Sequence, residues 1–310
     1  MKIRLRYLAF FVCLIILISI LRAQVSSSAE TKGSYFKTLQ QTLIKDGFDQ
    51  AWINSLYSKP EVYFETEGVS RFLVHREATL NYDQFASPDS IQRARQYMQT
   101  YKSILENTEQ SYGVDKEIIT AIILIESQFG TLMQGPSTLN ILSTMASLAN
   151  PNIRNMLWKE ATRSRKLSRK RYEKWAQRKS KWAYIELKAF LKYTAKEDID
   201  PSAVYGSYAG AVGIAQFMPS NILAYAKDGD NDGKVDLFTH ADAIASIANY
   251  LKYYGWNADI NRAKAEKVIF RYNRSTYYVD AVLKISDLLN PNKAKVGDTP
   301  DPLITGLSLH

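Results

Sequence analysis

Residues 116–130, KEIITAIILIESQFG, decide the expected fold. Apolar residues fill almost every position from Ile118 to Ile125, so a helix here is apolar on nearly all sides. Such a helix is expected at the centre of a helical body. Asp115 is a suitable N-cap for it and Gly130 a natural stop, which places Glu126 in the last helical turn.

A carboxylate ion is disfavoured twice at that position. Burial removes water from it, and the C-terminal end of a helix carries partial negative charge. Both effects raise the expected pKa of Glu126, which suits a general acid near neutral pH. The alternative is a glutamate that caps backbone groups or pairs with an arginine.

Helical periodicity dominates the rest of the chain. One apolar face includes Phe36, Leu39, Leu43 and Ile44, and a second follows the start signal Pro88-Asp89-Ser90. The second face comprises Ile91, Ala94, Tyr97, Met98, Tyr101, Ile104 and Leu105. Strand-like alternation is limited to residues 61–64 and 69–74. We therefore predict a mainly α body over residues 35–290, with a small β or irregular element.

A glycine-rich segment, GSYAGAVGIAQFMPS, occupies residues 206–220. It lacks the Lys-Ser/Thr pair of a phosphate-binding loop, so nucleotide binding is not expected. Small residues at this density allow a close approach of the backbone to another helix or to a ligand. Gln216 and Phe217 precede the break at Pro219 and are candidates to line a cleft.

An acidic loop follows at residues 228–236, DGDNDGKVD. Acidic residues at positions 1, 3, 5 and 9 with glycine at position 6 match the spacing of an EF-hand calcium loop. Position 12 is Thr239 instead of the usual glutamate, and Asp242 is the nearest replacement. The alternative is a solvated Asp/Gly turn.

Composition narrows the class of protein. The chain has 310 residues, 46% of them hydrophobic and 23% charged, which excludes a disordered chain. Its single cysteine, Cys13, excludes a disulfide framework and a cysteine-based metal site. The formal net charge of +9 indicates an anionic partner but does not identify it.

The N-terminus resembles an export signal. Residues 1–23 combine a basic start, an apolar run over 8–21 and a small residue at Ala23, and a polar linker follows over 24–34. The apolar run is shorter than the roughly 20 residues of a membrane span, so we expect cleavage rather than a permanent anchor. Export to the periplasm is predicted, with membrane association if the leader is retained. Residues 291–310 are expected to form a loosely ordered tail.

Residues 154–181 form an unusually basic helical insertion. Ten basic residues and one acid, Glu173, lie between Arg163 and Lys181. One interpretation is an amphipathic helix with a solvated cationic face. The other is a contact with anionic wall polymer or a membrane surface through residues 163–181.

Together these motifs resemble the membrane-bound lytic murein transglycosylase B family, which cleaves peptidoglycan on a lysozyme-like fold. The resemblance spans about residues 36–289. It rests on the Glu126 helix, the glycine-rich segment, the acidic loop, residues 242–256 and the stretch Arg271-Tyr272-Asn273-Arg274-Ser275 with Tyr278. It implies a lysozyme-like core with a helical N-terminal part. Residues 154–181 look longer and more basic than is usual for the family.

The resemblance also implies roles for individual residues. Glu126 would be the catalytic acid and base. The residues implied to line the glycan cleft are Ser207, Gln216, Phe217, Tyr250, Tyr272, Asn273 and Tyr278. Those implied to hold a structural calcium ion are Asp228, Asp230, Asp232, Lys234 through its carbonyl, and Asp242.

The implied reaction cleaves the bond between N-acetylmuramic acid and N-acetylglucosamine and leaves 1,6-anhydro-muramoyl ends. Two alternatives stay open: a catalytically inactive peptidoglycan-binding or scaffolding protein, and a lysozyme-like hydrolase. Nucleic acid is not an expected partner, because no recognisable nucleic-acid module is present.

Overall fold

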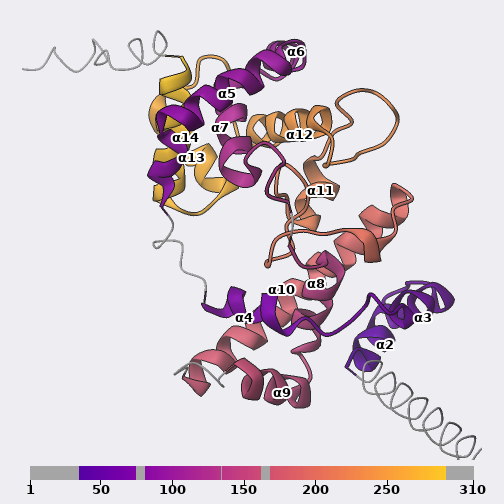
Figure 1. The fold of residues 1–310 in the computed structure, drawn as a ribbon. Helices are drawn as coiled ribbons and strands as arrows, with labels where there is room; N and C mark the ends of the chain where they lie inside the picture. The colour runs from indigo at the N-terminus through magenta and orange to yellow at the C-terminus, as the bar shows by residue number, and fades with distance from the viewer. Residues whose placement is uncertain (1–34, 75–80, 134, 162–167, 291–310) are drawn as a thin grey trace, which may run out of the picture. The chain divides into compact units, whose positions relative to one another are not determined.

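A computed structural model describes residues 35–74, 81–133, 135–161 and 168–290 (Figure 1). The predicted leader, linker and tail, and residues 162–167 of the basic segment, lie outside the described residues. The chain divides into two compact units. Unit 1 comprises Met1–Leu73 and Leu139–Lys188, and unit 2 comprises Val74–Thr138 and Ala189–His310.

Unit 1 is helical in its described part. Its helices are α2 (Lys37–Lys45), α3 (Gln50–Ser58), α4 (Thr66–Val74), α8 (Thr138–Ser147), α9 (Pro151–Ala161) and most of α10 (Arg169–Lys196). The buried apolar face predicted around Phe36 is confirmed, since Phe36 and Leu43 are 2% and 0% exposed.

Neither of the two strand candidates forms a strand, for different reasons. Residues 69–74 belong to α4, whose first turn is held by a hydrogen bond from the Gly68 N–H to Glu65 Oε1. Residues 61–64 form no regular element, and a side chain supplies their hydrogen-bond partner. The Tyr63 N–H donates to Asn140 Oδ1, and Asn140 Nδ2 donates to the Glu61 carbonyl. An amide from α8 therefore takes the place of a neighbouring strand.

Unit 2 is also mainly helical. Its elements are η2 (Tyr82–Ala86), α5 (Pro88–Thr100), α6 (Lys102–Tyr112), α7 (Lys116–Ser127), η3 (Pro201–Ala203), α11 (Pro219–Tyr225), α12 (His240–Tyr253), α13 (Arg262–Tyr272) and α14 (Thr276–Leu289). The helix start at Pro88 is confirmed, with Ser87 as its cap. The apolar face predicted over residues 91–105 belongs to two helices, which meet at Tyr101.

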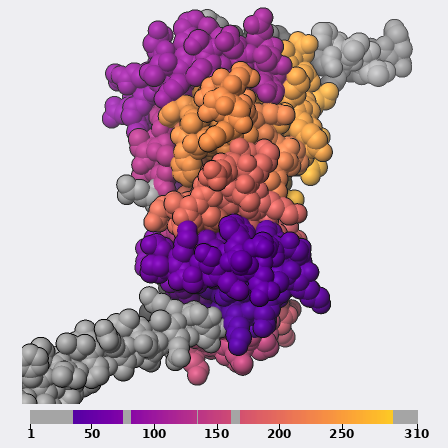
Figure 2. Space-filling model, turned by 90° about the vertical axis from the view of Figure 1, so that its right-hand side faces the viewer, coloured from indigo at the N-terminus to yellow at the C-terminus, as the bar shows by residue number. Residues whose placement is uncertain are grey.

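The helix of residues 116–127 is central, as its composition predicts. Residues from Ile118 to Leu124 are at most 3% exposed, and α7 packs against α14, α5, α6 and α12 (Figure 1). On the surface of unit 2, α6 (purple) adjoins α12 (orange) (Figure 2).

The small β element lies in the glycine-rich segment. Within the described residues, β pairing is limited to isolated bridges between Ser137 and Tyr205, Gly206 and Val212, and Val212 and Phe217. None of the described helices combines the length and the apolar content needed to cross a bilayer.

Candidate active site

The end of α7 positions Glu126. The helix stops one residue later, and Gln128, Phe129 and Gly130 follow with φ values of 47°, 63° and 81°. The Gly130 N–H donates to Ser127 Oγ at 3.0 Å, which closes this left-handed turn. The helix therefore ends before the predicted stop at Gly130, and the sharp turn leaves Glu126 half-buried at its end.

Tyr278 on α14 holds the Glu126 carboxyl group. Its hydroxyl donates to Glu126 Oε1 at 2.7 Å. Burial, and secondarily the Glu126 carboxylate, hold the pKa of Tyr278 well above its usual range. Tyr278 therefore stays protonated near neutral pH and remains a donor, which fixes the position of the Glu126 carboxyl group.

Glu126 opens into a hollow of about 360 Å³, here called the Glu126 hollow. Four of the residues implied to bind substrate line it with Glu126: Ser207, Gln216, Asn273 and Tyr278. Glu126 is the only carboxylate among its described lining residues; the polar groups beside it are amides and hydroxyls. Such a surface can bind a neutral polyhydroxylated ligand and leaves one group able to exchange a proton.

Phe217, Tyr250 and Tyr272 are not among the lining residues of the Glu126 hollow. Phe217 and Tyr250 are 2% and 4% exposed, and each packs against Tyr272 at ring distances of 5.8 Å and 5.1 Å. The hydroxyls of the two tyrosines bind backbone groups. Tyr250 donates to the Arg271 carbonyl, and Tyr272 donates to the Ala215 carbonyl. Tyr272 also stacks on Tyr278 at 6.4 Å, so this aromatic cluster supports the residue that holds Glu126.

The glycine-rich segment forms another part of the wall of the Glu126 hollow. Ser207 Oγ accepts hydrogen bonds from the N–H groups of Ala209 and Ala211. A Cβ on Gly206 would overlap the Ala211 carbonyl oxygen, so this close backbone approach requires glycine. Gln216 has a left-handed φ of 46°, and its Nε2 donates to the Gly213 carbonyl at 2.9 Å. These bonds fix the tight turn that brings Ser207 and Gln216 to the hollow.

A third wall comes from a segment that the motifs did not indicate. Asn81, Tyr82, Gln84 and Phe85, in and before η2, line the Glu126 hollow. Tyr82 packs edge-on against Tyr278 with ring centres 6.1 Å apart. The available sequence signal was the run of amides and aromatic rings just before Pro88, which has no apolar face of its own.

The acidic loop brings three carboxylates together. Oxygens of Asp228, Asp230 and Asp242 all lie within 4.8 Å of one another. The loop is folded by its own acids, since Asp228 accepts from the N–H groups of Asn231, Asp232 and Gly233. Asp232 accepts from the Lys234 N–H at 2.8 Å.

Asp242 is the buried member of this cluster. It is 2% exposed and accepts from the N–H groups of Gly229 and Asp236. Burial, together with Asp230 and Asp228, raises its pKa. Thr239 serves as the N-cap of α12, which explains why the carboxylate comes from Asp242 instead. A divalent cation fits this arrangement, because it would neutralise clustered oxygen ligands that otherwise repel one another.

Comparison with known proteins identifies a family and a relative that share sequence with this chain. The family model described as the transglycosylase SLT domain matches residues 31–265. The membrane-bound lytic murein transglycosylase B of Escherichia coli (strain K12) is 34% identical over 172 residues, which are 56% of this chain and 40% of that protein. The chain thus aligns with less than half the length of this curated relative.

Solved structures share the fold. The Escherichia coli lytic transglycosylase Slt35, in complex with calcium, superposes with a TM-score of 0.65 at 24% identity, covering 85% of this chain and 94% of that one. SltB3 from Pseudomonas aeruginosa, in complex with NAG-NAM-pentapeptide, gives a TM-score of 0.67 at 21% identity, covering 86% and 82%. The chain therefore has the lysozyme-like fold of lytic transglycosylases.

Proposed function

The chain belongs to the transglycosylase SLT domain family, and we propose that it is a lytic transglycosylase acting on the glycan strands of peptidoglycan. The observation that carries this proposal is the Glu126 hollow, where the described lining residues combine the one carboxyl group of Glu126 with amides and hydroxyls. The E. coli relative, whose name assigns it this activity, supports the same reaction class.

One carboxyl group suffices when the substrate supplies the nucleophile. Most glycosidases pair an acid with a second carboxylate that acts as nucleophile or activates water. In the proposed reaction Glu126 protonates the oxygen between N-acetylmuramic acid and N-acetylglucosamine as the C1–O bond breaks. The 6-hydroxyl of the muramoyl residue then attacks C1, and its proton passes to the Glu126 carboxylate. The new C1–O6 bond closes the 1,6-anhydro ring without consuming water.

The residues divide into two roles in this proposal. Ser207, Gln216 and Asn273 contact the glycan, because they line the Glu126 hollow with polar groups. Phe217, Tyr250 and Tyr272 act from behind it as a packed support for Tyr278, which positions Glu126. The cleft-lining role that the resemblance implies for these three residues gives way to this supporting role in the proposal.

We also propose a structural calcium ion in the acidic loop. Asp228, Asp230 and Asp242 would supply carboxylate oxygens, with Asp232 and the Lys234 carbonyl completing the set. The buried Asp242 carboxylate favours a bound cation, and the related Slt35 structure contains calcium. The ion would hold the loop before α12 in place and takes no part in the reaction.

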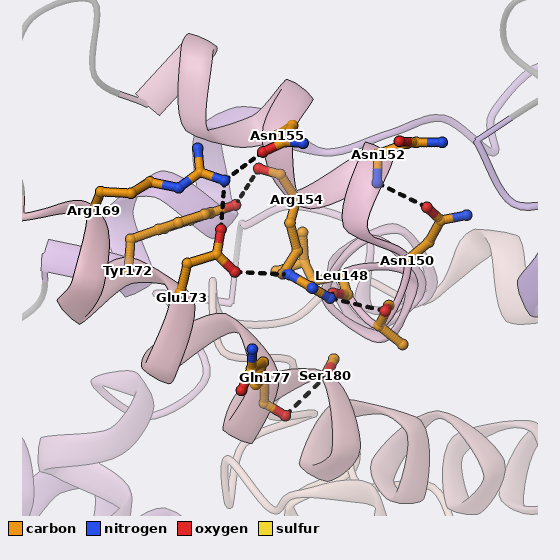
Figure 3. Close-up of polar contacts among 11 residues, drawn as sticks. Leu148, Asn150, Asn152, Arg154, Asn155, Arg169, Tyr172, Glu173, Gln177 and Ser180 are labelled. Atoms are coloured by element: carbon orange, nitrogen blue, oxygen red, sulfur yellow. Dashed lines mark hydrogen bonds and ion pairs between the residues drawn. The ribbon is translucent and has the colours of Figure 1, made fainter.

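The remaining proposals concern the place of action. Residues 1–34 support export to the periplasm, where peptidoglycan lies. The sequence of residues 163–181 is strongly basic, and the exposed cations in its described part, from Arg169 on, support an anionic partner for this segment. One of these cations already has partners within unit 1. Arg169 donates to Glu173 and to Asn155 (Figure 3), so its role is structural rather than in binding an anionic partner.

Digestion of purified sacculi tests the reaction. The wild-type chain should release muropeptides with 1,6-anhydro-muramoyl ends, and Glu126→Gln should reduce release by about 1,000-fold or more, since the acid and base are one group. Mass spectrometry separates the reaction classes, because a hydrolase yields products heavier by one water with reducing ends. Glu266→Gln, which alters an exposed carboxylate of unit 2, serves as the matched control.

Two outcomes would contradict the proposal. Reducing muramic ends from the wild-type chain would identify a hydrolase. Binding of sacculi without any released product, equal for wild type and Glu126→Gln, would identify a binding or scaffolding protein.

A further inference from the structure

Unit 1 contains an apolar crevice that the proposed reaction does not use. It lies between α2, the end of α8 and α10, and its volume is about 190 Å³. Its walls are mostly apolar and include Tyr35, Leu39, Ala146 and Tyr184. A cavity of about 150 Å³ admits a benzene ring, so this crevice has room for the end of one alkyl chain.

Ser147 gives the crevice one polar group. The residue is 6% exposed and lines the crevice, and its Oγ has no hydrogen-bond partner among the described residues. A buried hydroxyl without a partner is costly, so it indicates a ligand atom that accepts a hydrogen bond. An ester or head-group oxygen at the end of an alkyl chain meets this requirement.

A larger open space, here called the cationic hollow, adjoins the crevice. It measures about 760 Å³ and is lined by four basic residues, Arg154, Lys174, Arg178 and Lys181. Ala149, Ser180 and Lys181 line both spaces, so the crevice and the cationic hollow share one rim.

The cations of the hollow differ in availability. Arg154 is held by Glu173 and by the carbonyls of Leu148 and Ala149 (Figure 3). Lys174, Arg178 and Lys181 have no ion pair within the described part of the chain, and no acid lines the hollow there. An anionic group therefore meets three cations whose charge is not already compensated.

We propose that unit 1 binds an anionic membrane lipid. One alkyl chain fills the apolar crevice, and the negatively charged head group lies among Lys174, Arg178 and Lys181. A wall polymer offers the negative charge but no alkyl chain, so it leaves the crevice and Ser147 unexplained. This site shares no residue with the Glu126 hollow and stands independently of the proposed reaction.

Calorimetric titration of the full chain with dodecyl phosphate, below its micellar concentration, tests the site. Saturable binding is expected for this probe, which combines one alkyl chain with a phosphate. Inorganic phosphate and octyl glucoside, which carry the head or the chain alone, should each bind at least about tenfold more weakly, because each loses one part of the contact. Equal binding of either probe would overturn the proposal. So would equal, cation-dependent binding of a soluble anionic wall polymer.

Two matched pairs of variants locate the binding. Thr38→Trp places a large side chain at the exposed edge of the crevice and should abolish binding, while Gln41→Trp, on the same helix but outside the crevice, should not change it. Replacing Lys174, Arg178 and Lys181 with glutamine should weaken binding by about tenfold or more, since charge-assisted contacts are lost. The charge-matched control replaces Lys37, Lys45 and Lys159, which lie outside both spaces, with glutamine and should leave binding unchanged.

The outcome is separable from catalysis. Glu126→Gln should bind dodecyl phosphate as the wild type does, even where it no longer releases muropeptides. Unchanged binding in both Thr38→Trp and the triple glutamine variant would show that the lipid site is elsewhere.

Discussion

The position of Glu126 depends on the conformation of the backbone that follows it. Gln128 and Phe129 both adopt left-handed conformations before Gly130, which is uncommon for residues with side chains. Phe129 is held there by stacking on Tyr97, with ring centres 4.5 Å apart. Strained conformations of this kind persist where surrounding packing enforces them, and they cluster at functional sites. The sequence predicted the helix and its last turn, but not a stop imposed by an aromatic contact.

Tyr278→Phe tests the contact to Glu126 at the scale of one atom. It removes the hydroxyl that donates to Glu126 and leaves the ring packed on Tyr272 and Tyr82. We expect release of muropeptides to fall by about tenfold to 100-fold, as for loss of a hydrogen bond to a charged group. The rate of sacculus digestion measures this.

A control separates positioning from stability. Tyr277 is adjacent but 57% exposed, so Tyr277→Phe should leave the rate unchanged. If Tyr278→Phe digests sacculi at the wild-type rate with the same melting temperature, Tyr278 does not position Glu126.

At the scale of the element, the charged residues of the basic helix α10 have two different roles: some hold unit 1 together, and others are proposed to bind an anionic head group. One part of its face is structural: Glu173 accepts from Arg154 Nε and also pairs with Arg169 (Figure 3). The Arg169 guanidinium lies over the Trp158 ring at 5.2 Å, which joins α10 to α9. The sequence predicted an amphipathic cationic helix. It did not predict which cations pair, because that depends on Glu173 meeting a residue of α9.

Arg154→Ala should destabilise unit 1 by about 2–3 kcal/mol, since Glu173 and two carbonyls lose a donor in a half-buried setting. The Arg154 side chain is 13% exposed and donates to the carbonyls just after α8. Denaturant unfolding measures the loss. Arg171→Ala, at an exposed position of α10, should change the free energy of unfolding by less than about 0.5 kcal/mol. Equal effects of the two substitutions would contradict the structural role of Arg154.

For the whole molecule, the sequence predicted the features that depend on local patterns better than the features that depend on contacts between distant residues. The helical class, the central position of α7 and the start of α5 follow from periodicity and capping residues within each segment. Residues of η2 line the Glu126 hollow, and the segment of residues 61–64 is hydrogen-bonded to the Asn140 side chain. Both features depend on residues distant in sequence, which a pattern along the chain does not encode.

Calcium should stabilise the whole chain through the acidic loop. With the ion at about 100 times its dissociation constant, the melting temperature should rise by about 5–10 °C over the value in chelator. Asp242→Asn should abolish this increase, because it removes the buried carboxylate. Asp259→Asn, at an exposed position outside the loop, should retain it. A melting temperature that does not respond to calcium in the wild-type chain would rule out a stabilising ion.

The contact between α7 and α14 also has a consequence for biosynthesis. Glu126 and Tyr278 are separated by 152 positions, and α14 packs directly on α7. A nascent chain that has emerged only as far as α13 carries Glu126 without its hydrogen-bond partner. The contact between Glu126 and Tyr278 is therefore formed late in synthesis, and a polypeptide whose α14 has not yet docked does not yet have a complete Glu126 hollow.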